Sequence, residues 1–140
     1  MNPLGAASII TPGVDWLGVA PVALLALAAI GIVLQRSILR RASVAYPSAL
    51  VVAAVGIILS AIALTAQWKR VRTDGSYTTL SNMVAVDGFS IFIGGVVLFA
   101  TACSVLLASR YLDRERLDGP EYLALMLLSA SGMLAMSSSN

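Results

Sequence analysis

Residues 16–35 read WLGVAPVALLALAAIGIVLQ and contain no charged side chain. A helix needs about 20 apolar residues to cross the hydrocarbon core of a bilayer, and this run has that length. Three further charge-free runs follow at residues 42–68, 88–109 and 122–140. Because the apolar residues are continuous along these runs and do not alternate with polar ones, the pattern predicts helices and excludes membrane-spanning barrel strands.

The composition excludes an ordinary soluble domain. Of the 140 residues, 59% are hydrophobic and 11% are charged, whereas soluble proteins carry about 25% charged residues. We therefore expect an all-α integral membrane protein with four transmembrane helices. The expected segments are an outer N-terminal segment at 1–15, transmembrane helices at 16–35, 45–68, 88–109 and 121–138, an outer loop at 69–87, and a cytoplasmic loop at 110–120.

The basic residues indicate how the helices are oriented. They form three clusters: Arg36, Arg40 and Arg41; Lys69, Arg70 and Arg72; and Arg110, Arg114 and Arg116. An N-terminus outside the membrane puts the first and third clusters on the inner side, which the positive-inside rule favours. The clusters separate apolar runs, so the net charge of +2 indicates anchoring of helices and no nucleic-acid partner. The segment before the first helix lacks the basic region of a cleaved signal peptide.

Two acidic residues stand where helices are expected to begin. Asp87, in VAVDGFS, is expected to cap the helix that follows it, because a carboxylate there accepts hydrogen bonds from free N–H groups and meets the positive end of the helix dipole. In LDGPEY, Asp118 is expected to cap the fourth helix, with Pro120 in the first turn and Glu121 three positions after the cap. The acidic residues of this segment are also expected to pair locally with arginines in a solvated loop. These residues are Asp113, Glu115, Asp118 and Glu121.

Polar and aromatic residues near the ends of the runs are expected at the membrane interface. Gln35 and Gln67 stand near helix ends, from which their amides can reach the headgroup layer. The aromatic residues expected at this depth are Trp16, Tyr46, Trp68, Tyr111 and Tyr122, with Tyr77 in a loop.

Small residues spaced by four positions predict where helices approach one another closely. The predicted positions are the pairs Gly56 and Ser60, and Ser90 and Gly94, and a stripe formed by Ala100, Ser104 and Ala108.

The sequence predicts no catalytic, cofactor-binding or metal-binding residue. It contains no histidine and a single cysteine, Cys103, inside an apolar run, so we interpret this thiol as a packing residue. The four runs hold no charged side chain that would mark a proton or ion path across the membrane. From these residues alone, the chain is expected to be a membrane scaffold.

The region from Val86 to Asn140 resembles the early part of subunit N of the bacterial proton-pumping NADH-quinone oxidoreductase, complex I. The resemblance rests on VDGFSIF at a helix entry, on EYLALMLLSASGMLAM after a short charged loop, and on their spacing. Residues before Val86 fit this family only in topology and in the outer N-terminus. The "DG" helix entry is shared with subunits L and M and with subunits of multisubunit cation/proton antiporters.

The resemblance implies the N-terminal part of an antiporter-like subunit of about fourteen helices in the membrane arm of the complex. It implies that the chain stops after Asn140, shortly before a helix that carries a glutamate, and that lysines follow in later helices. No residue of that proton-translocating machinery has a counterpart here. The first three helices are then expected to form a ridge against neighbouring subunits, and the fourth to be the first helix of the antiporter-like repeat.

The family also implies which groups belong to the rest of the complex. Flavin mononucleotide and iron–sulfur clusters are expected in other subunits, quinone is a substrate of the whole complex, and no cofactor is expected in this chain. The expected partners are other membrane-arm subunits and the lipid bilayer, and the expected location is the bacterial inner membrane, crossed several times.

Two other functions fit the same four helices. One is a subunit of a multisubunit cation/proton antiporter, which has no NADH chemistry. The other is a four-helix membrane scaffold or assembly protein of natural length. As a subunit of the oxidoreductase the chain would be a non-redox part of an enzyme, and alone it is expected to have no catalytic activity.

Overall fold

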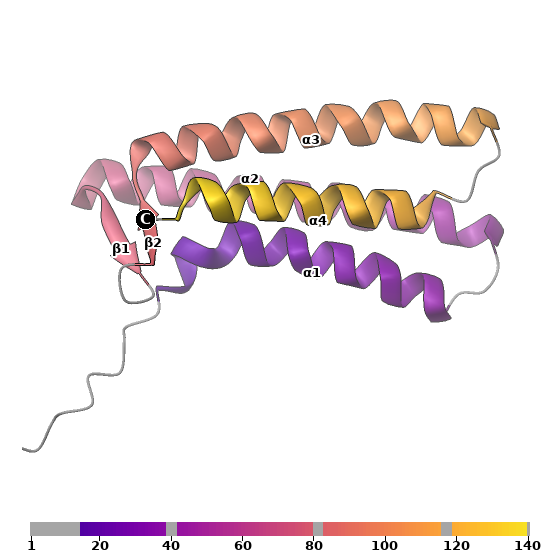
Figure 1. Cartoon of the computed structure of the whole chain (residues 1–140), viewed down its shortest axis with the longest axis horizontal. Helices are drawn as coiled ribbons and strands as arrows, with labels where there is room; N and C mark the ends of the chain where they lie inside the picture. Colours follow the sequence, from indigo (N-terminus) through magenta and orange to yellow (C-terminus); the bar gives the residue numbers. More distant parts are fainter. Residues whose placement is uncertain (1–14, 39–41, 80–82, 116–118, 140) are drawn as a thin grey trace, which may run out of the picture.

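The protein is a bundle of four helices, each running antiparallel to the one before it (Figure 1). The structure is a computed structural model and describes residues 15–38, 42–79, 83–115 and 119–139. The helices are α1 (Trp16–Ile38), α2 (Ala42–Asp74), α3 (Gly88–Glu115) and α4 (Pro120–Ser137). Helices therefore cover the first three charge-free runs, and α4 covers the fourth as far as Ser137. Helices α2 and α3 extend several residues past their runs into the charged segments that follow them.

A short β-hairpin closes one end of the bundle, where the sequence had predicted only a loop at 69–87. Strand β1 (Tyr77–Thr79) pairs antiparallel with β2 (Val84–Val86), with Tyr77 opposite Val86. Before the hairpin, α2 ends at Asp74, and the next residue, Gly75, has a φ of 83°, the left-handed conformation that glycine adopts most easily. The predicted helical fold is confirmed, and this short hairpin was not predicted because three-residue strands are too short to leave a periodic pattern in the sequence.

The end of α4 joins the same hairpin. The N–H of Ala85 donates to the carbonyl of Ser138 over 2.8 Å, and Ser139 forms a bridge with Val84. The Ser138 hydroxyl donates to the carbonyl of Leu134, which also accepts from the N–H of Ser138, and to the carbonyl of Ala135 in the last turn of the helix. The serines that close α4 therefore complete its last turn and attach it to β2.

The core lies along the axis of the bundle, where α1 and α4 pack together with α2 (Figure 1). Leu25 and Ile32 of α1 and Leu123 and Leu127 of α4 are fully enclosed. Leu25 and Ile32 are seven positions apart, and Leu123 and Leu127 are four positions apart. Each pair therefore lies on one face of its helix, and that face packs against the neighbouring helices. On α3 the buried face runs through Ile91, Leu98 and Val105.

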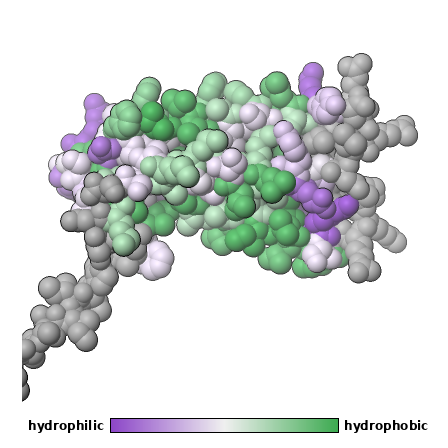
Figure 2. Space-filling view, viewed as in Figure 1, coloured by the Kyte–Doolittle hydropathy of each residue, from purple (hydrophilic) through white to green (hydrophobic). Residues whose placement is uncertain are grey.

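Large apolar side chains also cover the outside of every helix. The surface between the two ends of the bundle is predominantly hydrophobic in the view shown, and hydrophilic residues gather at the ends (Figure 2). Exposed apolar patches on soluble monomers rarely exceed a few hundred Å², and lipid is the environment in which such a surface is stable. By length and composition, three of the described helices can cross a membrane: Trp16–Ile38, Pro47–Asp74 and Gly88–Tyr111.

Helix α4 is not among those three candidate spans. It has 18 residues and opens with Pro120, Glu121 and Tyr122, which shorten its apolar part. It nevertheless contacts the other three helices and buries a face that includes Leu123 and Leu127. The chain is thus a multi-pass membrane protein with at least three candidate spans, and α4 packs among them.

Candidate functional site

The hairpin end of the bundle carries a group of polar side chains, which we call the polar cluster. Its members are the buried residues Ser60, Gln67 and Ser90 and the half-buried residues Ser137 and Ser138. These residues come from α2, α3 and α4 and from the turn after α4, and they surround the first turns of α1. Uncompensated polar groups are costly inside a bundle that faces lipid, so their partners decide what the cluster does.

One member of the cluster, Gln67, replaces a hydrogen bond that a proline removes from α1. Pro21 has no N–H, so the carbonyl of Leu17, four residues earlier, loses its donor within the helix. The side-chain amide of Gln67 donates to that carbonyl over 2.6 Å and to the carbonyl of Gly18 over 3.1 Å. Gln67 is only 4% exposed, so the prediction that it reaches the interface is wrong. Its position on α2 directs the amide toward the proline gap in α1.

Ser60 makes the second polar link between α2 and α1. Its hydroxyl is fully buried and donates to the carbonyl of Pro21 over 3.0 Å. One turn before it on α2, Gly56 lies so close to α1 that an added Cβ would collide with the Cβ of Ala28. The predicted close approach at Gly56 and Ser60 is confirmed, and the two helices are held by both packing and hydrogen bonds.

A small cavity lies in the middle of the polar cluster. Its volume is about 20 Å³, and its lining includes Gln67, Ser90, Ser137, Val86 and Leu134. A cavity needs about 10–15 Å³ by this measure to hold one water molecule, which then requires two to four polar partners. The space therefore accommodates a single water and is far too small for a quinone or a nucleotide.

Asp87 caps α3 as the sequence predicted. Its Oδ1 atom accepts a hydrogen bond from the N–H of Ser90 over 2.7 Å, and the Ser90 hydroxyl accepts one from the N–H of Asp87 over 3.1 Å. This reciprocal pair is a capping box. The hydrogen bond from the Ser90 backbone lowers the pKa of the Asp87 carboxyl below its usual range, against a smaller opposing effect of burial.

Arg70 joins several polar groups at the same end of the bundle. Its Nη1 atom lies 2.5 Å from Oδ2 of Asp15, and its Nε atom lies 3.9 Å from Oδ2 of Asp74. The guanidinium also lies 4.8 Å from the ring centre of Tyr77. Burial raises the pKa of the Tyr77 phenol, and the negative charge of Asp15 adds to this effect while Arg70 opposes it.

Asp15 is a residue whose role sequence reasoning missed. Its Oδ1 atom accepts a hydrogen bond from the N–H of Leu17, so it caps α1 in addition to pairing with Arg70. The available signal was an aspartate directly before an apolar run, the same pattern that identified Asp87. Asp15 and Arg70 together tie the start of α1 to the end of α2.

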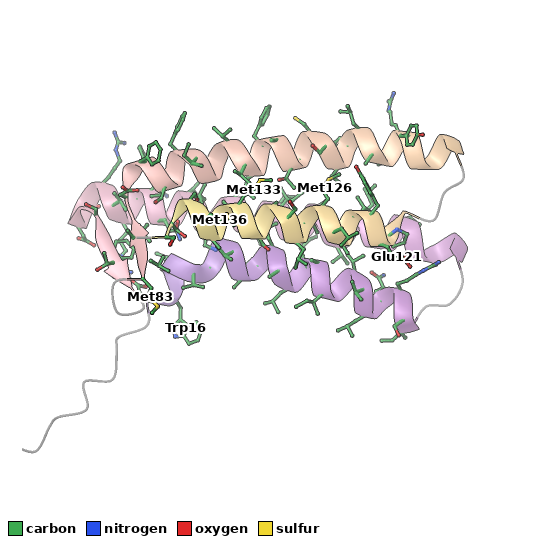
Figure 3. The ribbon with its side chains drawn as sticks, viewed as in Figure 1. Trp16, Met83, Glu121, Met126, Met133 and Met136 are labelled. Atoms are coloured by element: carbon green, nitrogen blue, oxygen red, sulfur yellow. The ribbon has the colours of Figure 1, made fainter. Side chains whose placement is uncertain are left out.

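At the opposite end of the bundle, α1 and α4 are joined by a weaker ion pair. Nε of Arg36 lies 3.9 Å from Oε1 of Glu121, whose side chain is mostly exposed near the start of α4 (Figure 3). Glu121 therefore pairs across helices with α1. The N-cap residue of α4 is Gly119, and Pro120 opens the helix as predicted. Asp118 lies outside the described residues, and the side chains of Asp113 and Glu115 are not described.

The other sequence predictions have mixed outcomes. Gly94 is confirmed as a contact position, since an added Cβ would lie 3.1 Å from Leu64 of α2 and 3.2 Å from Leu134 of α4. In the predicted stripe of Ala100, Ser104 and Ala108, the first two residues make no close helix approach, because they are exposed on the side of α3 away from its buried face, and Ala108 is half-buried.

Two predictions about polar and aromatic residues at helix ends also differ in outcome. Gln35 is half-buried, and its Oε1 atom is enclosed with no hydrogen-bond donor among the described residues. Trp16 is 80% exposed and points away from the bundle at the hairpin end, as expected of an interfacial aromatic residue (Figure 3). The side chain of Tyr46 is not described.

These groups hold the helices together through hydrogen bonds and ion pairs. Within the described residues, no group of three or more His, Cys, Asp or Glu side chains could hold a metal ion. Charged side chains occur near helix ends and are absent from the middle of each apolar run. The polar cluster has hydroxyl and amide groups but no acid or base, so its arrangement supports structural hydrogen bonding.

Comparison with known proteins identifies the kind of chain in which this bundle occurs. The chain is 30% identical over 129 residues to NADH-quinone oxidoreductase subunit N 2 of Koribacter versatilis, a match that takes in 91% of this chain. The chain matches a segment of NADH-quinone oxidoreductase subunit N. Similarity is also found to subunit N of Gemmatimonas aurantiaca, at 34% identity over 89 residues, and of Methylobacterium nodulans, at 38% over 63 residues.

The extent of these matches shows which part of the chain is similar to subunit N and how much of each relative the chain covers. A match over 91% of the chain necessarily includes α1 and α2, so the similarity to subunit N is not restricted to the region after Val86. The chain spans 26% of the length of the Koribacter protein, 16% of the Gemmatimonas protein and 13% of the Methylobacterium protein. No protein-family model matches the chain, and no solved structure matches it significantly.

Proposed function

We propose that this chain is a structural part of the membrane arm of an NADH-quinone oxidoreductase, in which electron transfer from NADH to quinone is coupled to proton translocation. The observation that carries this proposal is the similarity to subunit N over 91% of the chain. The apolar surface of the helices supports a position inside the membrane arm, where neighbouring subunits and lipid would cover it.

Within that complex, the proposed role of this part is to pack helices and not to conduct protons. The charge-free runs support this role, since an ionisable side chain within the membrane usually marks a proton or ion path. The polar cluster also supports this packing role, because the side chains of Gln67 and Ser60 donate hydrogen bonds to backbone carbonyls of α1. Flavin and iron–sulfur chemistry would belong to other subunits, and quinone would be a substrate of the whole complex.

We further propose that all four helices cross the bacterial inner membrane, with the N-terminus outside. The inner side would then carry Arg36 and Arg110, and the hairpin would lie on the outer side. Helix α4 would span the membrane with its 18 residues, about 27 Å of helix, because the other three helices enclose one of its faces. The antiporter alternative is less well supported, since the matching relatives named above are subunits of the oxidoreductase.

An exchange experiment tests this function. The matching segment of subunit N from Koribacter versatilis would be replaced by this chain, and assembly and NADH-driven proton pumping would be measured in membrane vesicles. We expect an assembled complex that retains pumping. In the matched control, the exchanged segment carries Gln67→Leu, and we expect less assembled complex but unchanged pumping per assembled complex. An assembled complex with normal NADH oxidation but no pumping would contradict a purely structural role.

The isolated chain provides a second test of the structural role. Reconstituted into liposomes under a pH gradient, it should conduct no protons above the level of protein-free vesicles. A proton leak that is removed by a substitution inside one of the helices, such as Ser60→Ala, would contradict the proposal.

A further inference from the structure

A groove lies between α2 and α3 on the outside of the bundle. Its volume is about 450 Å³, and its lining is almost entirely apolar. Ala61 of α2 and Gly95 and Ala102 of α3 lie along it, and such small side chains leave the space between the two helices unfilled. In agreement, α2 and α3 contact each other less extensively than α1 and α2 do. The volume is within the range of about 300–1,000 Å³ that is usual for small-molecule sites.

The groove reaches the membrane interface at Trp68. This side chain is partly exposed and lies at the hairpin end of the groove, and Ile57 lies at the other end. Eleven residues separate them, which corresponds to about 16 Å of helix. A second hollow of about 410 Å³ shares Trp68 and Gly95 and continues past Phe92 on the outer face of α3. The groove therefore begins at interface depth and extends into the hydrocarbon region.

Two cations stand at the interfacial end of this groove. Arg72 follows Trp68 by one helical turn, and its guanidinium lies 5.7 Å from the centre of the Trp68 ring. Lys69 follows Thr65, which also lines the groove, by one turn. Residues four apart lie on the same face of a helix, so Lys69 and Arg72 both extend the groove-lining face of α2 toward the interface.

These cations differ from Arg70, which lies between them in the sequence. Arg70 is paired with Asp15 and Asp74 and stacks on Tyr77. Neither Lys69 nor Arg72 forms an ion pair with any residue in the part of the chain that the structure describes. Within the described residues, two positive charges thus have no ion-pair partner beside an apolar groove, on the side that the proposed orientation places outside the membrane, where basic residues are not expected.

We propose that this groove binds an anionic phospholipid, with the phosphate between Lys69 and Arg72 and an acyl chain along the α2–α3 groove. A phospholipid combines a negatively charged headgroup with an apolar tail, and a phosphate forms strong hydrogen bonds with lysine and arginine side chains. A helix from another protein would fill the apolar space but would leave the two cations unexplained. The lipid also accounts for the basic cluster at residues 69–72, which the positive-inside rule does not explain.

Tryptophan fluorescence tests the proposal because the chain has two tryptophans. In the variant Trp16→Phe, Trp68 is the remaining reporter and lies in the groove. The protein would be reconstituted into vesicles that contain either brominated phosphatidylglycerol, which is anionic, or brominated phosphatidylcholine, which is zwitterionic. We expect the anionic lipid to quench Trp68 with a higher relative binding constant, by about fivefold for each of the two cations and so by about 25-fold in all.

Substitution of the two cations should remove this preference. In the Trp16→Phe background, Lys69→Gln with Arg72→Gln should lower the ratio of the two binding constants to about one, while Arg110→Gln at the other end should leave it unchanged. All three positions are exposed, so the helices should keep their circular dichroism spectrum. Equal quenching by the two lipids, or a preference that survives loss of both cations, would overturn the proposal.

Filling the groove tests the position of the acyl chain. Gly95→Leu adds a side chain where a Cβ would meet only ordinary contact with Leu64, and it should reduce quenching of Trp68 by bromine on the acyl chains. The matched control is Ile62→Phe, a similar enlargement on the exposed face of α2 outside the groove, which should not reduce quenching. If neither lipid quenches Trp68 in the folded protein, another protein surface covers the groove and the proposal is wrong.

Discussion

Gln67 shows how a single side chain can permit a proline inside a membrane helix. Pro21 removes a donor from α1, and the amide of Gln67 supplies donors to two carbonyls from the neighbouring helix. Lipid has no water to replace a missing hydrogen bond, so the defect in α1 and the amide in α2 depend on each other. The start of α1 is therefore stable only when α2 is packed against it.

Gln67→Leu should destabilise the bundle. It keeps the approximate size of the side chain but leaves the Leu17 and Gly18 carbonyls without their donors. We expect a loss of about 1–2 kcal/mol in the free energy of unfolding in detergent, which is the upper range for hydrogen bonds between membrane helices. The control is Thr65→Val, which removes an exposed hydroxyl that bonds only within its own helix. Equal stability of the two variants would contradict this role of Gln67.

Asp87 should make the stability of the chain depend on acid pH. Its pKa is lowered in the folded protein, so its stabilising effect is complete above the unfolded value of about 3.9 and is lost as the pH falls through the lowered folded value. Asp87→Ala should cost about 1 kcal/mol at pH 7. Asp87→Asn retains a good cap but should lose the pH dependence between pH 5 and 2.

Thermal unfolding in detergent at several pH values measures both Asp87 variants. The matched reference is Asp74→Asn, a change at an exposed carboxylate near the end of α2. An acid response in Asp87→Asn as large as in the parent chain would contradict the assignment of this pH dependence to Asp87.

At the residue scale, local signals were predictable from the sequence and distant partners were not. Asp87 could be recognised because its bonds reach only three positions along the chain. Gln67 could not, because its partners lie 49 and 50 residues away and depend on how α1 rotates against α2. The signal that could have indicated a partner is Pro21, since a proline within a helix implies an orphaned carbonyl.

At the scale of elements, the contact between α1 and α2 depends on the absence of a side chain at Gly56. In Gly56→Ala, the new methyl group collides with Ala28, so the helices must separate. We expect a loss of about 1–3 kcal/mol, as for other overpacked sites, although alanine is the better helix former. Chemical unfolding followed by circular dichroism measures this change.

Two matched variants separate the collision from helix propensity. Gly132→Ala in α4 adds a methyl group where nothing lies within 4 Å, so it should be neutral or stabilising by up to about 1 kcal/mol. Ala28→Gly combined with Gly56→Ala removes the opposing methyl group and should restore part of the lost stability. A Gly56→Ala protein as stable as Gly132→Ala would show that α1 and α2 do not meet at this position.

Element type and order could be predicted because the charge-free runs are long and continuous. The contact face of α3 could not be deduced from small residues alone. Ala100 and Ser104 have the spacing of a packing stripe but are exposed, while Ile91, Leu98 and Val105 form the buried face. In a membrane helix both faces are apolar, so hydrophobic periodicity does not distinguish the protein-facing side from the lipid-facing side.

At the scale of the whole molecule, the two ends of the bundle differ in chemistry. The hairpin end contains the polar cluster and the network of Arg70, whereas the opposite end is joined by the ion pair of Arg36 with Glu121. The hairpin and its bond from Ala85 to Ser138 were not predictable, because they depend on the ends of α2, α3 and α4 meeting at one place. In the proposed orientation, the hairpin end of the bundle lies outside the membrane.

Cysteine labelling tests that orientation. Cys103 would be replaced by serine, and a single cysteine introduced either as Ser76→Cys beside the hairpin or as Ser37→Cys at the opposite end; both serines are exposed. In intact spheroplasts, a membrane-impermeant maleimide should label the first variant and not the second. After the membrane is permeabilised, both should react. Labelling of Ser37→Cys alone in intact cells would establish the reverse orientation.

The association of this chain with an NADH-quinone oxidoreductase is best tested by isolating it with its partners. An affinity-tagged copy would be purified in mild detergent from membranes of the organism that encodes it, and the co-purifying proteins would be identified by mass spectrometry. We predict that it brings down other membrane-arm subunits together with NADH:quinone oxidoreductase activity. Recovery of a well-folded chain alone, or together with subunits of a cation/proton antiporter and no such activity, would contradict the account.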